Sequence, residues 1–302
     1  MNDLSFSQLV DLMKWPLIAS LTLPWLLVYL GLHIVRRGVI FVDLALAQTA
    51  AFGTCLALAC HYDVHDWQSF AFSMGFTFVG AALLTFARTK DQRVPQEALI
   101  GILYVAAAAA SILALSRSAG GNEELQRSLV GELLVVPPAE VLKTIGLYVA
   151  VGITHFIFRK QFLAISENAT QAAAKGLNVR WWDFLFYMLF GLVVTSFVHI
   201  GGVLLVFSYL VVPAVCATFL VNSFTVRFVV GLGIATLCSV ISLFLTGKVV
   251  DFPIGAAIVC VLAVALLITV IFARLIRRPA PPSNRTAPVL GRSNAPMRAD
   301  GR

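Results

Sequence analysis

The chain has 302 residues, of which 59% are hydrophobic and only 12% are charged, and its mean hydropathy is +0.90. A soluble protein of this size needs roughly a quarter of its residues charged to cover its surface. The composition therefore excludes an ordinary soluble domain and predicts an all-α polytopic membrane protein, because long apolar runs satisfy their backbone polar groups in lipid as helices.

In chain order, the apolar segments predict a bundle of about 8–9 transmembrane helices within residues 1–278. We expect spans near residues 15–35, 39–60, 68–87, 98–116, 140–158, 183–200, 202–222, 228–246 and 253–273. The sixth and seventh spans meet at Gly201-Gly202 and are alternatively one broken unit. Residues 279–302 are polar, basic and rich in proline, which predicts a disordered tail.

Lysine and arginine set the predicted orientation, because short cytoplasmic loops are enriched in both. The richer set of alternate loops contains Arg36, Arg37, Arg88, Lys90, Arg93, Arg159, Lys160, Lys175, Arg180, Arg227, Arg274, Arg277 and Arg278. We expect this set to face the cytoplasm of a multi-pass protein of the cell (inner) membrane, with the tail against anionic membrane lipid. The net charge of +7 is then a topology signal, and no nucleic-acid partner is expected.

Polar residues inside the apolar segments are the first candidates for a substrate pathway. Asp43 and Gln48 lie within a predicted span, where an unpaired charge costs several kcal/mol, so such a residue marks a transport path by default. Alternatively, Asp43 pairs with Arg36 or Arg37, and Gln48 forms a helix–helix hydrogen bond. His199, near the outer end of the sixth span, is either a third pathway residue or an interfacial histidine.

A polar connector follows the second span and contains His61, Asp63 and His65. If this connector is helical, the i, i+4 spacing places both imidazoles on one face, which suits a metal such as zinc. The segment is therefore a candidate outer site for metal capture. The alternative is a short polar loop between two spans.

Four stretches, in order and over roughly residues 25–275, resemble the permease subunits of zinc and manganese ABC importers, the ABC-3 family. They are residues 41–53, 169–179, 202–214 and 251–256. The resemblance implies an ABC importer permease architecture, a transported divalent metal (zinc, manganese or iron), a permease homodimer, a separate ATP-binding cassette ATPase that holds ATP, and an extracytoplasmic metal-binding protein. It implies no cofactor bound by this chain and a transporter subunit that is not an enzyme.

The Asp and His of the family's metal-binding pair do not match this chain. Alignment of Ala45-Leu46 places Leu44 at the position of the Asp and Gln48 at the position of the His. Asp43 lies one residue earlier, which turns it about 100° around a helix. A neutral amide is also a poor ligand for zinc, so the identity of the metal stays open.

The resemblance implies contact surfaces for both partners. A cytoplasmic helix that ends at a glycine is expected to dock on the ATPase. The alternative is a helix in a loop at the membrane interface. The residues expected to contact the ATPase are Glu167, Asn168, Ala172, Lys175 and Gly176. The long outward loop is expected to dock the binding protein through its carboxylates, with a solvated loop as the alternative. These carboxylates are Glu123, Glu124 and Glu132.

Three other functions remain open. The nearest is an ABC permease for a metal chelate or another small solute. A secondary transporter would show inverted repeats and several buried acids, and neither is evident. An intramembrane hydrolase would need a cluster of acid, base or nucleophile, which the sequence lacks. The chain has no Gly-x-x-x-x-Gly-Lys-Ser/Thr motif, so it is not itself the ATPase.

Overall fold

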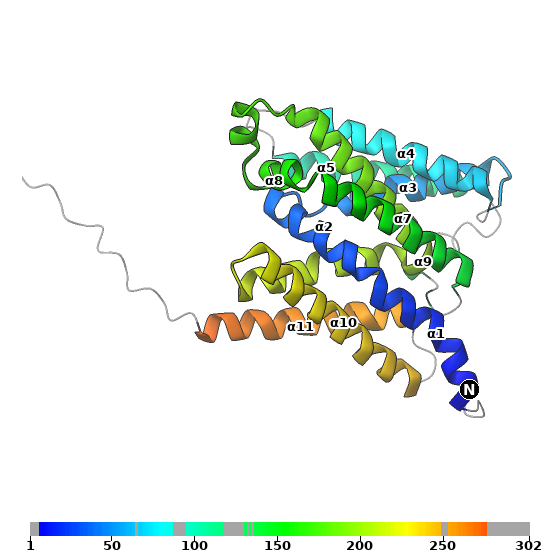
Figure 1. Cartoon of the computed structure of the whole chain (residues 1–302). Coiled ribbons are helices and arrows are strands. Elements are labelled where there is room, and N and C mark those ends of the chain that lie inside the picture. The colour runs from blue at the N-terminus through cyan, green and yellow to red at the C-terminus, as the bar shows by residue number, and fades with distance from the viewer. Residues whose placement is uncertain are drawn as a thin grey trace, which may run out of the picture.

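The computed structural model describes residues 6–63, 66–86, 95–116, 130–131, 133, 136–248 and 253–276. Within these ranges the regular elements are helices, which confirms the all-α prediction (Figure 1). In chain order they are α1 Phe6–Thr22, α2 Pro24–Arg37, α3 Val42–Ala59, α4 Trp67–Phe86, α5 Gln96–Leu115, α7 Pro138–Ile157, α8 Arg159–Ala174, α9 Val179–Leu220, α10 Phe224–Lys248 and α11 Ile254–Ile276. The predicted tail, residues 279–302, lies outside the described residues.

Eight helical segments of the described ranges are long and apolar enough to cross a bilayer. The first combines α1 and α2, because the backbone stays helical through Leu23, at φ −68° and ψ −34°. Pro24 lies at the junction of α1 and α2 and has no N–H to donate to the preceding turn. Gly38 ends α2 in the left-handed conformation, at φ 69°, and its N–H donates to the Val35 carbonyl oxygen.

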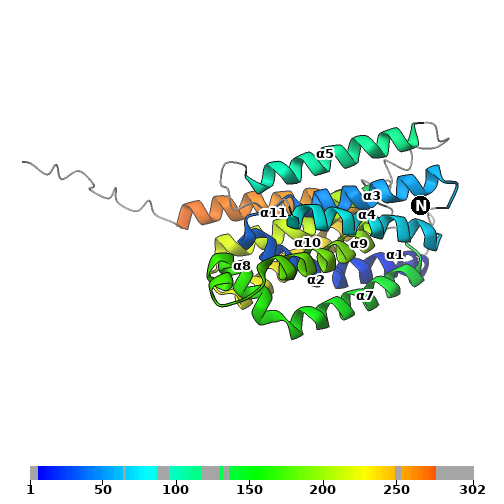
Figure 2. The same cartoon turned by 90° about the horizontal axis from the view of Figure 1, so that it is seen from above.

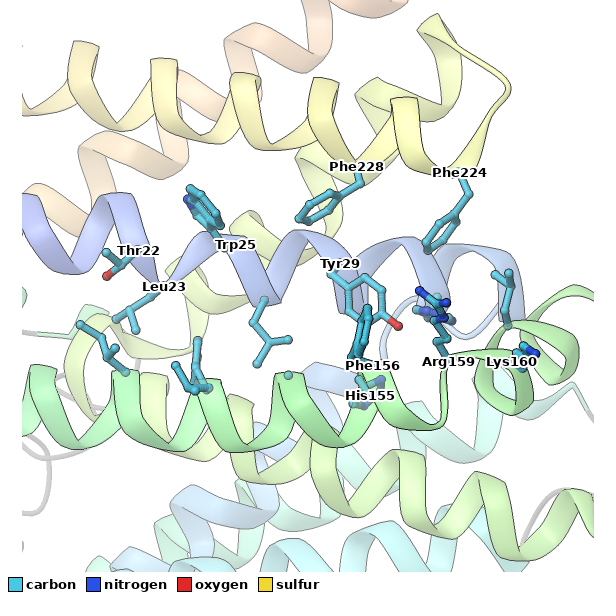
Figure 3. Close-up of a pocket in the computed structure, with 17 residues that line it drawn as sticks. Thr22, Leu23, Trp25, Tyr29, His155, Phe156, Arg159, Lys160, Phe224 and Phe228 are labelled. Carbon is cyan, nitrogen blue, oxygen red and sulfur yellow. The ribbon is translucent and has the colours of Figure 1, made fainter.

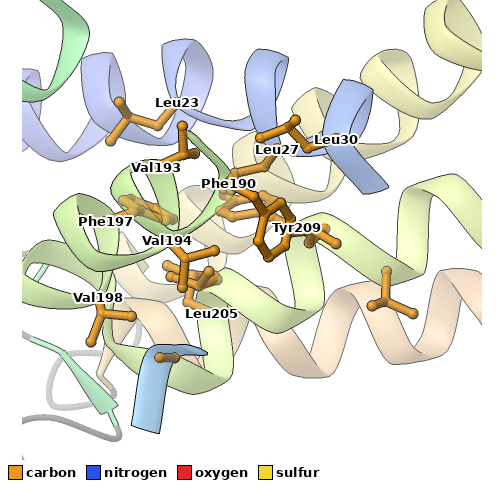
Figure 4. Packing of buried hydrophobic residues seen from close by; sticks show 14 of the residues in the cluster. Leu23, Leu27, Leu30, Phe190, Val193, Val194, Phe197, Val198, Leu205 and Tyr209 are labelled. Carbon is orange, nitrogen blue, oxygen red and sulfur yellow. The ribbon is translucent and has the colours of Figure 1, made fainter. Parts of the chain in front are cut away.

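The 42-residue α9 contains both the sixth and the seventh predicted span. A straight helix of this length would measure about 63 Å, twice the roughly 30 Å of a hydrocarbon core. Gly202 interrupts α9 with φ 73° and ψ 165°, a backbone conformation that is open almost only to glycine. The rings of Phe197 and Tyr209 lie 6.2 Å apart, so the chain reverses between them (Figure 4). The boundary predicted at Gly201-Gly202 is therefore confirmed, and α9 supplies two crossings.

The two halves of α9 form the centre of the bundle and contact α2, α3, α4, α7, α10 and α11. The fully buried side chain of Leu27 from α2 lies beside the Phe190 and Tyr209 rings, and Leu23, just before α2, lies beside Val193 (Figure 4). A Cβ added at Gly31 would lie only 1.9 Å from the Leu210 carbonyl oxygen. The backbones of α2 and α9 are therefore in direct contact, as small residues permit in membrane bundles.

The outer helices are much less covered by the rest of the chain. Only 22% of the residues in the apolar spans of α5 and of α11 are buried, against 72% for α3. Figure 2 shows α5 and α7 on opposite sides of the bundle. These outer faces are thus available to lipid or to another chain.

Candidate substrate pathway and coupling site

Asp43 lies in the first turn of α3, and only 1% of the residue is exposed. Neither of its carboxylate oxygens has a hydrogen-bond partner among the described residues. Glu97, in the first turn of α5, accepts a hydrogen bond from the Ile40 backbone N–H at 2.6 Å and is an electrostatic neighbour of Asp43. Two carboxylates therefore converge where α3 and α5 begin, at helix ends whose dipoles favour negative charge. The sequence analysis did not identify Glu97.

The two arginines that precede Asp43 pair with other residues. Arg36 Nη1 lies 3.0 Å from Glu167 Oε1, and Arg37 Nη1 lies 2.8 Å from Asp183 Oδ1. The alternative in which Arg36 or Arg37 neutralises Asp43 is therefore wrong for this conformation.

Gln48 is also buried, with 6% exposed, but it faces away from Asp43. The five helical steps from Asp43 to Gln48 turn the two side chains about 140° apart around α3. Gln48 instead shares its helix face with the half-buried Leu44 and with Phe41, which is 49% exposed. In the part of the chain that the structure describes, no three His, Cys, Asp or Glu side chains come together to hold a metal ion.

His199 is exposed near the end of the first half of α9. Its Nδ1 donates to the Thr195 carbonyl oxygen at 2.8 Å, which leaves Nε2 as the acceptor of a neutral ring. Asp183, which contacts Arg37 at the other end of this half, lies sixteen residues away, or about 24 Å along a helix. The structure therefore does not bring His199 together with Asp43, and its pathway role stays a prediction.

The predicted outer capture site is only partly described. His61 has φ 66°, and residues 61–63, the described part of the connector, are not helical. The exposed Asp63 donates its backbone N–H to Asp66 Oδ2 at 3.0 Å. His65 lies outside the described residues. The carboxylates predicted to dock the binding protein also lie outside them: Glu123, Glu124 and Glu132.

The predicted coupling segment forms the second part of α8. Asn168 breaks the helix, with φ −157° and ψ 98°, and its Oδ1 accepts a hydrogen bond from the Gln171 N–H at 3.0 Å, as a helix cap does. Gly176, at φ 85°, donates to the Ala173 carbonyl oxygen at 2.9 Å and ends the helix, which confirms the predicted stop. Ala172 is buried and Lys175 is exposed, so this short helix has an inner and an outer face.

A buried polar cluster joins α8 to α2 and α9, and the sequence analysis did not predict it. The Ser166 hydroxyl lies 2.9 Å from both Arg37 Nε and His33 Nδ1. Arg37 also forms the ion pair with Asp183, in which the two side chains are 6% and 1% exposed. The Arg37 guanidinium lies 3.8 Å from the centre of the Phe186 ring, a cation–π contact.

Through this cluster, α8 is connected by hydrogen bonds to α2, and α2 is connected by an ion pair to α9. Buried charge-assisted hydrogen bonds are directional and costly to leave unpaired, so a displacement of α8 is opposed unless α2 and α9 follow. The outer Arg36–Glu167 pair adds little, because Glu167 is 57% exposed. Ser166, Arg37 and Asp183 therefore connect the first part of α8, just before the break at Asn168, to α2 and α9.

Known proteins are similar to this chain in sequence and in fold. The model of the ABC 3 transport family matches residues 9–273. The manganese transport system membrane protein MntC of Listeria innocua is 27% identical over 264 residues, which cover 85% of this chain and 89% of that protein. The chelated iron transport system membrane protein YfeD of Yersinia pestis is 23% identical, over 94% of this chain and 90% of that protein.

A solved structure gives the architecture. PsaBC from Streptococcus pneumoniae, in complex with Fab, matches with a TM-score of 0.73 and 22% identity over 88% of this chain and 95% of that chain. The predicted ABC permease fold is thereby confirmed. Because the family match also covers most of the sequence, the chain belongs to the ABC 3 transport family.

Proposed function

We propose that this chain is the permease subunit of an ABC importer for a divalent metal ion, with manganese as the first candidate. The observation that carries the proposal is the family match over residues 9–273, together with relatives that are named for manganese transport. In this proposal two copies form the pathway in the cell (inner) membrane, a separate ATPase binds ATP, and an extracytoplasmic protein delivers the metal.

The chemistry of the polar side chains in α3 and α5 favours manganese over zinc. Asp43, Glu97 and Gln48 offer oxygen atoms, which suit Mn²⁺, whereas zinc prefers imidazole and thiolate. Gln48 lies on the same side of α3 as the N-cap residue Phe41, but Gln48 is itself buried, with 6% exposed. Asp43 and Glu97, in the first turns of α3 and α5, place carboxyl oxygens close to one end of α3.

In this proposal the coupling segment transmits movement from the ATPase subunits to the helices of the substrate pathway. Closure of the ATPase subunits would push on α8, and the Ser166–Arg37–Asp183 cluster would carry the displacement into α2 and α9. Since α9 packs against α3, the movement would reach the helix that bears Asp43 and Gln48. This sequence of movements is alternating access driven by a separate ATPase subunit.

A second candidate substrate is a metal chelate. The observation in its favour is the absence of the family's Asp and His from positions 44 and 48, which hold leucine and glutamine. A chelated metal brings its own ligands and needs no such pair. YfeD of Yersinia pestis, 23% identical, is named for chelated iron.

Elemental analysis of cells separates the two candidates. Cells with and without this chain and its ATPase subunit are grown in metal-limited medium and then supplied with manganese, iron or zinc, each free or chelated. The proposal predicts a selective, ATPase-dependent rise in manganese from the free ion. A rise only with a chelated metal would favour the second candidate, and no change in any metal would refute metal import.

A further inference from the structure

A groove of about 670 Å³ lies between α2, α7 and α10, with its far end at the start of α8 (Figure 3). Trp25 and Phe156 flank it and are 57% and 66% exposed. Most of the lining is aliphatic or aromatic. The volume is in the usual range for sites that bind a small organic molecule, roughly 300–1,000 Å³.

The length of the groove matches one leaflet of a bilayer. It runs from Thr22, at the end of α1, to His33 in α2, and along α7 from Ile145 to Phe156. Eleven helical steps correspond to about 17 Å. Half of a hydrocarbon core measures about 15 Å, so an acyl chain that follows the groove would extend from the bilayer centre to the membrane surface.

The end of the groove at the membrane surface is basic. Arg159 and Lys160 are exposed and line it, and none of the 17 described lining residues is acidic. The Arg159 guanidinium rests 4.7 Å from the centre of the Phe156 ring, which holds it at the mouth. The Tyr29 hydroxyl points toward Arg159 (Figure 3), and α8 begins here without a side-chain cap. Cations and uncapped helix N–H groups both favour an anion.

A polar group also lies behind this mouth. His155 lines the same end, is 1% exposed, and has no hydrogen-bond partner for either ring nitrogen among the described residues. Its ring stacks on Phe162 at 4.4 Å and meets the edge of Tyr29. The site thus combines an apolar channel of leaflet length with an end where positive charge and unused polar atoms gather.

We propose that this groove binds an anionic phospholipid of the leaflet on the arginine-rich side. One acyl chain lies between α2 and α7, and the phosphate contacts Arg159 and Lys160. The lipid would join α7 and the start of α8 to α2 and α10, so it supports the region where the coupling segment meets the bundle. Charge complementarity and groove length select this occupant over a neutral lipid or a second protein chain.

The test uses the fluorescence of Trp25 in the full chain, reconstituted in bilayers. A low and equal mole fraction of brominated phosphatidylglycerol or brominated phosphatidylcholine is added, and the signal of a Trp25→Phe variant is subtracted. Two cations near the headgroup, at about 1 kcal/mol each, predict stronger association of the anionic lipid by roughly 30-fold. Replacement of both Arg159 and Lys160 by alanine should remove the preference, whereas the same change at Lys175 and Arg180 should retain it.

A second pair of variants tests the channel. A Cβ at Gly152 meets nothing within 4 Å, so Gly152→Leu adds an apolar side chain to the lining of the groove from a position with open space. Gly146 lies on the same helix with equally open space but does not line the groove, so Gly146→Leu is the matched control. Lower quenching of Trp25 is expected in Gly152→Leu alone. The proposal would be overturned by equal quenching of Trp25 in the two glycine variants or by equal quenching by the two lipids. It would also be overturned if no lipid quenched Trp25 because another chain covered it.

Discussion

The hydroxyl of Ser166 joins the coupling helix α8 to α2, and its removal should uncouple ATP hydrolysis from transport. Ser166→Ala leaves Arg37 Nε and His33 Nδ1, each 2.9 Å from the hydroxyl oxygen, without this partner. Arg37 retains its ion pair with Asp183, so α2 stays attached to α9, while α8 keeps, among the described residues, only the exposed Arg36–Glu167 pair with α2. The change is therefore directed at the coupling link, with the bundle left intact.

The size of the effect follows from the burial of the three groups. A hydrogen bond to a charged group contributes about 1.5–3 kcal/mol and a neutral one about 1 kcal/mol, so the contact of α8 with α2 should weaken by roughly 2–4 kcal/mol. Ser242 is the matched control, because it is equally buried but returns its hydrogen bond to Cys238 of its own helix at 2.8 Å. Ser242→Ala removes a hydroxyl of the same kind without loosening a contact between helices.

The assay measures metal imported per ATP hydrolysed by the assembled transporter. Ser166→Ala should lower this ratio by about tenfold or more while ATP hydrolysis continues, and the thermal unfolding temperature in detergent should fall by a few degrees. Ser242→Ala should leave the ratio unchanged. An unchanged ratio in Ser166→Ala, in protein that is folded and assembled, would refute the coupling role of the cluster.

Three further substitutions test the fold and the pathway. Gly31→Ala, whose Cβ would lie 1.9 Å from a backbone oxygen of α9, should sharply reduce the folded protein recovered by size-exclusion chromatography, whereas Gly233→Ala, which faces open space, should not. Gly202→Ala should cost about 1–3 kcal/mol of stability, and an unchanged unfolding temperature would contradict the chain reversal. Asp43→Asn should reduce manganese accumulation at least tenfold with normal amounts of protein in the membrane; wild-type accumulation would exclude Asp43 from the pathway.

Much of the fold could be predicted because spans and breaks are local signals. Apolar length identified the membrane helices, and the glycine pair at Gly201-Gly202 marked the reversal within α9. Gly176 likewise marked the end of α8, since a left-handed residue stops a helix wherever the rest of the chain lies.

The polar contacts could not be predicted, because they join residues that are far apart in the chain. Arg37 and Asp183 are 146 positions apart, and Arg37 and Ser166 are 129 apart. Along α3 the apolar residues surround the whole helix, so the sequence did not indicate which face carries Asp43 or that Glu97 approaches it. These contacts depend on how the helices pack against one another, and local patterns in a single sequence do not specify that packing.

Uptake of radioactive manganese into proteoliposomes tests the central claim most directly. The chain is reconstituted with its ATPase subunit, and the loaded binding protein is supplied on the outer side with ATP inside. We predict uptake that requires ATP and is abolished by a hydrolysis-deficient ATPase. Manganese entry that persists without ATP hydrolysis, or no manganese entry by a complex that hydrolyses ATP in response to the binding protein, would contradict the account.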